Sequence, residues 1–446
     1  MKEQSSFLGG VCRLAVPVAL QSMLQSSFSI VDQVMIGQLG SVSVAGVGIA
    51  GKFASIFSVV VSAVGAVAGI MISQYIGQKN RRGVRRGFYL NLFASLAIAA
   101  VFTALCLLFP GAIMRLYTKD AATARAGEEY LAVIAGTYFP MAAATLLSAF
   151  FRCSEKPKLP LYASIVSALL NTGLNYVLIF GKFGFPQMGA RGAAVATVVS
   201  QCANALLMLL MLPRRDSMLA REESAQAQPF NWKQYFAMLA PILVCEGLWS
   251  LGENVYAAIY GHMGTEASAA MTLINPVQGL VIGALCGLSQ AAGVIVGKTL
   301  GEGEYEQAYR DSKKLILYGA VSSLALSAAV VLTSGLYVEI YKVEASVKLL
   351  TRQILTAYAL VAPFKVLNMI LGGGIIRSGG KTQYVMLIDI IGTWGFGVPF
   401  GLLAAFVLKL SIPYVYFMLS LEEAVRFLIS LVVFRRRKWM QSLQAA

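Results

Sequence analysis

Charged residues are scarce in this chain of 446 residues, at 13% of the total, whereas soluble domains carry about 25%. Apolar residues make up 57%, and they occur in long runs rather than in amphipathic stripes. Runs of about 20 apolar residues are long enough to cross a bilayer as helix. The alternation expected of long β-strands is absent, and helices then satisfy the backbone hydrogen bonds within the membrane. The sequence therefore predicts an all-α membrane protein.

Patterns typical of metal sites and disulfides are also lacking. His262 is the only histidine, and it lies in a short Gly-His-Met-Gly turn, where one imidazole cannot build a metal site. The six cysteines occur singly, in or beside apolar runs, without a Cys-x-x-Cys pair. Small apolar fillers are the simplest interpretation of these residues. We therefore expect no cofactor and no metal site of this kind.

A phosphate-binding loop is missing as well. The nearest match runs from Gly293 to Thr299, but it has three residues between its glycines where the motif needs four, and it ends an apolar helix. This argues against an ATP-driven pump, and we do not expect an enzyme. An ion gradient remains as the energy source, because one charge moving down 100 mV releases about 2.3 kcal/mol.

Twelve apolar runs are long enough to span a membrane. Lys and Arg are spread unevenly over the predicted loops, with 24 on the side of the two termini and eight on the other. This bias predicts a protein of the cell (inner) membrane with both termini in the cytoplasm, where Trp232 and Trp439 are expected to anchor the interface. The net charge of +15 then indicates topology and contact with anionic lipid rather than nucleic-acid binding. The predicted spans are 12–37, 45–75, 88–109, 128–151, 160–181, 188–212, 235–260, 267–297, 314–335, 347–372, 383–408 and 412–434.

The two halves of the chain are similar, because a shift of 224 residues aligns their first two helices without a gap. We predict an N-lobe over 1–222 with helices 1–6 and a C-lobe over 223–446 with helices 7–12, joined by a polar linker near 213–233. Each half has six spans, so the lobes are parallel and related by a pseudo-two-fold axis along the membrane normal. Two such lobes around a central cavity are typical of a transporter rather than a receptor. Matching pairs include Pro17 and Pro241, Val31 and Val255, Gly37 and Gly261, Gly69 and Gly293, and Gly77 and Gly301.

Acidic side chains inside the predicted spans are the candidates for ion coupling, because an ionised acid near the bilayer centre costs about 2.5–3.5 kcal/mol. Asp32 lies in the outer half of the first span, where solvation at the helix end is the alternative. Glu246 and Glu253 lie seven residues apart on one face of the seventh span, and Asp389 lies in the eleventh. For these three, hydrogen bonding within a lobe or pairing with Lys365 is the alternative.

Further polar residues of the spans are expected to line the cavity or to form hydrogen bonds with neighbouring helices. Glu422, Glu423 and Arg426 have spacings of three and four in the last span, which predicts an intrahelical ion pair. The polar residues expected at the cavity are Gln33, Asn171, Asn175 and Tyr256.

Several motifs follow one another in a distinctive order. They are the stretch from Pro17 through Asp32 to Gly40, the stretch from Pro241 through Glu246 to Gly264, the run from Asn171 to Thr197, and the run from Ile376 to Pro399. Together they resemble the multidrug and toxic compound extrusion (MATE) family over essentially the whole chain. The resemblance implies a twelve-helix antiporter that exports cationic or amphiphilic compounds in exchange for H⁺ or Na⁺. It implies ion coupling at Asp32, a match in type to the family's helix-7 glutamate at Glu246, and Na⁺ as an occupant of either.

Two departures from the family pattern leave the coupling ion open. Asn175 stands where one proton-coupled branch has aspartate, and Lys381 stands where many relatives have Asp after two glycines. A flippase of a lipid-linked precursor, in the same superfamily, is one alternative function, but Lys365 is the main basic residue available for its phosphates. A membrane scaffold or sensor is another. We expect a monomer whose partners are small cationic or amphiphilic substrates and membrane lipid.

Overall fold

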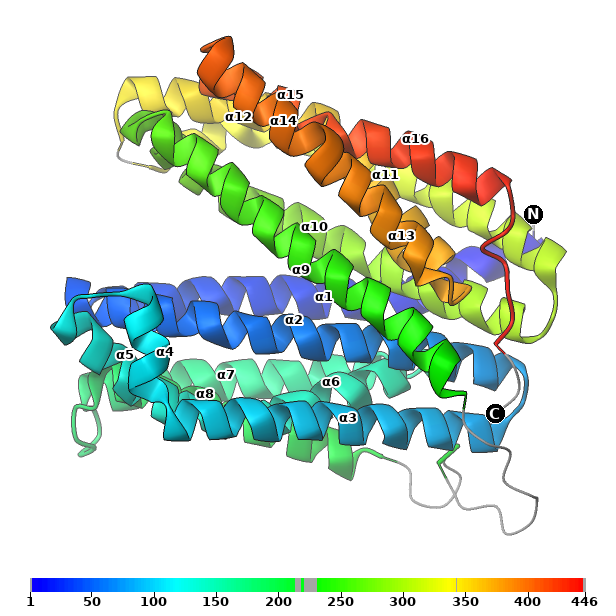
Figure 1. The fold of residues 1–446 in the computed structure, drawn as a ribbon, viewed down its shortest axis with the longest axis horizontal. Coiled ribbons are helices and arrows are strands. Elements are labelled where there is room, and N and C mark those ends of the chain that lie inside the picture. Colours follow the sequence, from blue (N-terminus) through cyan, green and yellow to red (C-terminus); the bar gives the residue numbers. More distant parts are fainter. Residues whose placement is uncertain (1, 213–217, 220–230, 342, 444–446) are drawn as a thin grey trace. The chain divides into compact units, whose positions relative to one another are not determined.

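The computed structural model describes residues 2–212, 218–219, 231–341 and 343–443, which are almost entirely helical (Figure 1). No strand occurs in these ranges. Eleven helical segments among them are long and apolar enough to cross a membrane. The predicted class, an all-α protein with multiple membrane spans, is confirmed.

The first half consists of long helices and one short helix, α4 (Pro110–Tyr117), which the predicted spans did not include. Pro110 lies in the first turn of α4, where its missing N–H leaves no helical hydrogen bond unmade. A 3₁₀ turn, η1 (Ala135–Thr137), connects α5 (Ala121–Ile134) to α6 (Tyr138–Cys153) within one span. The other helices are α1 (Lys2–Gly37), α2 (Ser41–Gly77), α3 (Arg81–Leu108), α7 (Lys158–Phe180) and α8 (Gly189–Leu210).

The second half differs from the first by three π-helical segments, η2 (Met369–Ile376), η3 (Ile390–Gly397) and η4 (Leu403–Val407). π-helical segments are rare in proteins, and those that occur are frequently located at functional sites. They widen the helix and change the direction of its side chains. The α-helices of this half are α9 (Trp232–His262), α10 (Thr265–Gly301), α11 (Tyr305–Glu339), α12 (Ala345–Asn368), α13 (Thr382–Asp389), α14 (Val398–Leu402), α15 (Ile412–Ser420) and α16 (Glu422–Arg435).

The helices extend beyond several of the predicted apolar runs. α1 begins at Lys2 rather than at residue 12, and α11 begins at Tyr305 rather than at 314. Hydropathy locates the apolar part of a helix, whereas the hydrogen-bonded helix continues into its polar flanks. The predicted twelfth span is interrupted at Leu421 between α15 and α16, so it is not among the eleven.

Residue contacts divide the chain into two compact units. The C-terminal unit consists of Met1–Ala19, Ser73–Lys79 and Pro229–Ala446, and the N-terminal unit consists of Leu20–Ile72 and Asn80–Gln228. The first helices α1 and α2 therefore contribute to both units. The predicted lobe boundary at 222/223 and most of the predicted linker lie outside the described residues. The two lobes and the cavity between them remain a prediction.

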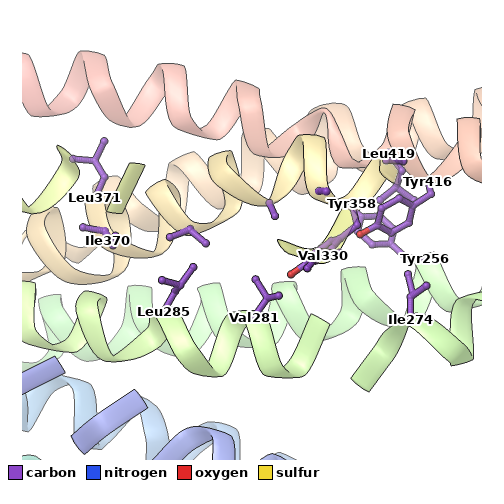
Figure 2. Close-up of a cluster of buried hydrophobic side chains, with 14 of the residues drawn as sticks. Tyr256, Ile274, Val281, Leu285, Val330, Tyr358, Ile370, Leu371, Tyr416 and Leu419 are labelled. Carbon is purple, nitrogen blue, oxygen red and sulfur yellow. The ribbon is translucent and has the colours of Figure 1, made fainter. Parts of the chain in front are cut away.

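Each unit has its own hydrophobic core. In the N-terminal unit, Phe57 is fully buried and its ring centroid lies 4.4 Å from that of Tyr138. In the C-terminal unit, Tyr256, Tyr358 and Tyr416 gather at one end of the core (Figure 2). This aromatic end of the core borders a cavity.

Two glycines that the repeat makes equivalent bring α2 and α10 into close contact within the C-terminal unit. A Cβ on Gly77 would lie 2.9 Å from the carbonyl carbon of Lys298, and one on Gly301 would lie 2.8 Å from that of Gln74. Positions 74 and 298 are themselves related by the shift of 224. The contact is therefore reciprocal, as a local two-fold axis requires. We call these residues, Gln74, Gly77, Lys298 and Gly301, the glycine seam.

The C-terminal segment packs beside this seam. The backbone N–H of Leu443 donates to Gln74 Oε1 at 2.6 Å, and Gln78 Nε2 donates to the Leu443 carbonyl at 2.8 Å. Trp439 is fully buried and donates through Nε1 to the carbonyl of Phe434 at 3.2 Å. The expectation that Trp439 anchors the membrane interface is wrong, because its ring packs inside the protein. Trp232, in contrast, is exposed.

Candidate functional site

Asp32 on α1 is held by two asparagines on α7 within the N-terminal unit. Asn175 Nδ2 donates to Asp32 Oδ1 at 2.5 Å. Asn171 lies one turn earlier on the same helix face, and both amide side chains are buried, whereas Asp32 is half-buried. No basic residue of the described ranges forms an ion pair with Asp32. The predicted one-turn spacing of the asparagines thus brings both amides to the predicted acid.

The amide of Asn171 can serve either protonation state of this carboxyl group. With its nitrogen toward Asp32, it donates to Oδ1 at 2.8 Å and approaches Oδ2 at 3.3 Å. With its oxygen in that position, it can accept a hydrogen bond from a protonated carboxyl. Asn175 Oδ1 is buried without a partner among the described residues. The described partners of the Asp32 carboxyl group are therefore neutral amides that can donate or accept hydrogen bonds.

Gln33, the neighbour of Asp32, is exposed, and no hydrogen bond joins it to either asparagine among the described residues. Farther along α1, Gln21 Nε2 donates to Ser164 Oγ on α7 at 2.9 Å. This buried hydrogen bond joins the same pair of helices that meet at Asp32.

The two predicted glutamates of α9 line different cavities of the C-terminal unit. Glu253 borders a cavity of about 350 Å³, which we call the tyrosine cavity. Tyr256, also predicted, lines it and donates to Glu422 Oε2 at 2.5 Å. Three carboxyl groups and one lysine provide its charge. Its lining includes Glu253, Tyr256, Tyr260, Met271, Tyr358, Lys365, Tyr416, Glu422 and Glu423.

Glu246 borders a second cavity, of about 390 Å³, which we call the arginine cavity. Arg377 Nη2 lies 3.5 Å from Glu246 Oε1, so the glutamate is paired. The topology prediction counted Arg377 as a loop residue, but it contributes to this cavity because η2 directly precedes it. The lining also includes Cys245, Lys365, Asn368, Met369, Gly372, Asp389, Glu423 and Arg426.

Asp389 is paired with Arg426, which donates to Asp389 Oδ1. The Cys245 thiol donates to Asp389 Oδ2 at 2.5 Å. Arg426 also lies 3.5 Å from Glu423 and 3.9 Å from Glu422, as the intrahelical spacing predicts. No sequence pattern indicated the contact of Arg426 with Asp389, which is 37 residues away. The nearest signal was the presence of three charged residues inside an apolar run.

Lys365 lines both cavities but forms no ion pair within the described part of the chain. The alternative in which Lys365 pairs with a predicted acid is not met there; Arg377 pairs with Glu246, and Arg426 pairs with Asp389. No group of three or more His, Cys, Asp or Glu side chains in the described ranges could hold a metal ion.

Comparisons with known proteins agree with this architecture. A family model described as MatE matches residues 17–177 and 241–403. The "Probable multidrug resistance protein NorM" of Thermotoga maritima is 25% identical over 431 residues, covering 96% of this chain and 92% of its own length. The "Multidrug and toxin extrusion protein 1" of Oryctolagus cuniculus is 24% identical, with 97% and 76% covered. A crystal structure of a MATE protein in complex with MaL6 superposes with a TM-score of 0.87 at 18% identity, covering 96% and 95% of the two chains.

Proposed function

Since this chain belongs to the MatE family, we propose that it is a secondary active multidrug efflux antiporter. It would export cationic or amphiphilic compounds in exchange for H⁺ or Na⁺ by alternating access. We propose a monomer in the cell membrane, and the threefold bias of basic residues supports a cytoplasmic location of both termini. The multidrug resistance and extrusion names of its relatives support this function.

The observation that carries the proposal is the environment of Asp32. Its carboxyl group contacts neutral amides and has no basic partner in the described ranges, so nothing fixed neutralises it. A charge inside a membrane protein is strongly disfavoured unless it is balanced. A proton or Na⁺ arriving at Asp32 supplies that balance, and its binding biases the equilibrium between conformations.

The tyrosine cavity supports a cationic substrate. Glu253, Glu422 and Glu423 outnumber Lys365 in its lining, which favours positive charge. Tyrosine rings hold organic cations through their π faces, and a volume of about 350 Å³ is in the range of small-molecule sites. The flippase alternative is not favoured, because a phosphate ligand needs the opposite charge.

Reconstitution into liposomes tests the function. We expect wild-type protein to move a fluorescent organic cation such as ethidium only when a proton or Na⁺ gradient is imposed, with each gradient applied separately. Asp32→Asn should bind the dye but lose at least tenfold of the gradient-driven rate. Asp120→Asn, which changes an exposed acid, is the matched control and should keep the wild-type rate. Full gradient-driven activity in Asp32→Asn would remove Asp32 from the mechanism.

A further inference from the structure

Arg426 is the centre of a buried charge cluster, which we define as Asp389, Glu422, Glu423 and Arg426. Its guanidinium group donates to Asp389 and lies 3.5 Å from Glu423 and 3.9 Å from Glu422. The Arg426 side chain is only 13% exposed. One fixed cation is therefore shared by three carboxyl groups from two helices, α13 and α16.

The backbone of η3 is shaped around this cluster. A Cβ on Gly392 would lie 2.5 Å from Cδ of Arg426, and one on Gly397 would lie 3.1 Å from the carboxyl carbon of Glu422. Any larger residue at either position would displace a member of the cluster. The space for both charged side chains is thus part of the fold.

The cluster lies where the two cavities share lining residues. Glu422 lines the tyrosine cavity, whereas Asp389 and Arg426 line the arginine cavity. Glu423 and Lys365 line both. A cation that binds in either cavity therefore competes with Arg426 for the same carboxyl groups.

Fixed positive charge is in deficit around the two cavities. Their described lining has more carboxyl groups than basic groups, and Arg377 is already paired with Glu246. Glu253 is exposed and solvent ions can neutralise it, whereas uncompensated carboxylates among the less exposed acids are strongly disfavoured, so mobile cations or protons supply their remaining counter-charge. The acids are Glu246, Glu253, Asp389, Glu422 and Glu423, and the bases are Lys365, Arg377 and Arg426.

We propose that Arg426 is a tethered cation that determines how many mobile cations the cavities of the C-terminal unit bind. It occupies one cation position permanently, so the protein binds one mobile cation fewer than its carboxyl groups would otherwise hold. Arg426 is thus a positioning residue that sets stoichiometry. This inference rests on the proposed function only for transport. There, the number of mobile cations bound is the number of ions exchanged per substrate molecule.

A cavity-forming variant tests the proposal by direct binding. Arg426→Gly removes the whole side chain and leaves space for a free guanidinium ion beside Asp389. We expect purified Arg426→Gly to bind one more [¹⁴C]guanidinium per chain than the wild type at millimolar concentration. The double variant Arg426→Gly/Asp389→Asn should lose most of this gain, because the principal acceptor is gone. Equal binding by Arg426→Gly and the wild type would overturn the proposal.

Matched variants separate stoichiometry from folding. Arg437→Gly removes another arginine that forms an ion pair, with Glu306 on the exposed surface, and it should gain no guanidinium site. If Arg426→Gly is not recovered as monodisperse protein, Arg426→Lys and the charge-compensated Arg426→Gln/Asp389→Asn carry the test. Both should keep the wild-type number of ²²Na⁺ ions or protons bound, and a change of one in either would contradict the proposal.

Transport distinguishes this inference from the proposed function. If wild-type liposomes show no gradient-driven efflux, the function fails, whereas the guanidinium result stands by itself. If efflux occurs, Arg426→Gln should move one more positive charge per dye molecule, measured as current on a solid-supported membrane. An unchanged ratio in a transporting Arg426→Gln would refute the role of Arg426 in stoichiometry.

Discussion

The Asp32 site and the Arg426 cluster handle buried charge in two different ways. In the described part of the N-terminal unit, the hydrogen-bond partners of the Asp32 carboxyl group are the neutral amides of Asn171 and Asn175. In the C-terminal unit, three carboxyl groups surround one guanidinium. Because its partners are neutral, Asp32 can bind or release a cation without leaving a fixed basic group unpaired, whereas a carboxylate in a fixed ion pair cannot. In the proposed mechanism Asp32 exchanges its ion, whereas Arg426 stays in place as a fixed positive charge beside its three carboxyl groups.

The largest expected effect comes from removing the fixed cation. Arg426→Met should destabilise the protein by about 3–5 kcal/mol, because it leaves buried carboxyl groups uncompensated. Thermal unfolding of the purified protein measures this loss. Adding Asp389→Asn should recover part of it, and an Arg426→Met protein as stable as the wild type would show that the cluster is not a fixed ion pair.

A smaller effect is expected at the neutral site. Asn175→Ala removes the donor to Asp32 at 2.5 Å and should cost about 1–3 kcal/mol, the usual range for a buried polar group that loses its partner. Thermal unfolding of the purified protein measures this loss. Asn175→Asp, which keeps the size of the side chain, is measured beside Asn175→Ala. A loss as large as that of Arg426→Met would remove the contrast between the two units.

The two halves of the chain make equivalent contacts at the glycine seam, so substitutions there test this equivalence. Gly77→Ala and Gly301→Ala should each cost about 1–2 kcal/mol net, because overpacking outweighs the higher helix propensity of Ala. The reciprocal contacts predict nearly equal losses in thermal unfolding. Gly9→Ala is the control, since nothing lies within 4 Å of its added Cβ, and it should be neutral or stabilising. Clearly unequal losses would contradict the two-fold relation at the seam.

The smallest effect concerns an exposed acid that neither site uses. Asp120 caps α5, and hydrogen bonds from the Thr123 hydroxyl and backbone N–H lower the pKa of its carboxyl group. Because the pKa of Asp120 is lower in the folded state, the ionised cap stabilises the folded state fully above the usual Asp pKa of about 4. This stabilisation is lost as the pH falls through the lowered pKa of the folded state. Carboxyl NMR titration of Asp120 should therefore show a pKa below the usual value. A normal pKa, or one unchanged by Thr123→Val, would contradict this capping interaction.

Much of the fold was predictable because membrane spans are local patterns. Hydropathy located the spans, and the one-turn spacing of Asn171 and Asn175 correctly put them on one face. The same local reasoning predicted the contacts of Arg426 with Glu422 and Glu423. It could not find Asp389 or the pairing of Arg377 with Glu246, because those contacts depend on how separate helices pack.

Local pattern also failed where a helix changes its geometry. The interruption at Leu421 and the π-helical η2 and η3 have no hydropathy signal, yet η2 and η3 supply residues or space for the arginine cavity and its cluster. Trp439 shows the converse error, since a tryptophan near a predicted interface turned out to be packed inside.

The sequence by itself determined the helical class, the repeat and the identity of Asp32 as an acid inside the first span, because apolar length, periodicity and residue type are properties of the chain alone. Only the tertiary structure decided which charges are neutralised. Counter-charges come from distant helices, and their distances of a few ångströms depend on packing, which sequence spacing within one helix does not encode.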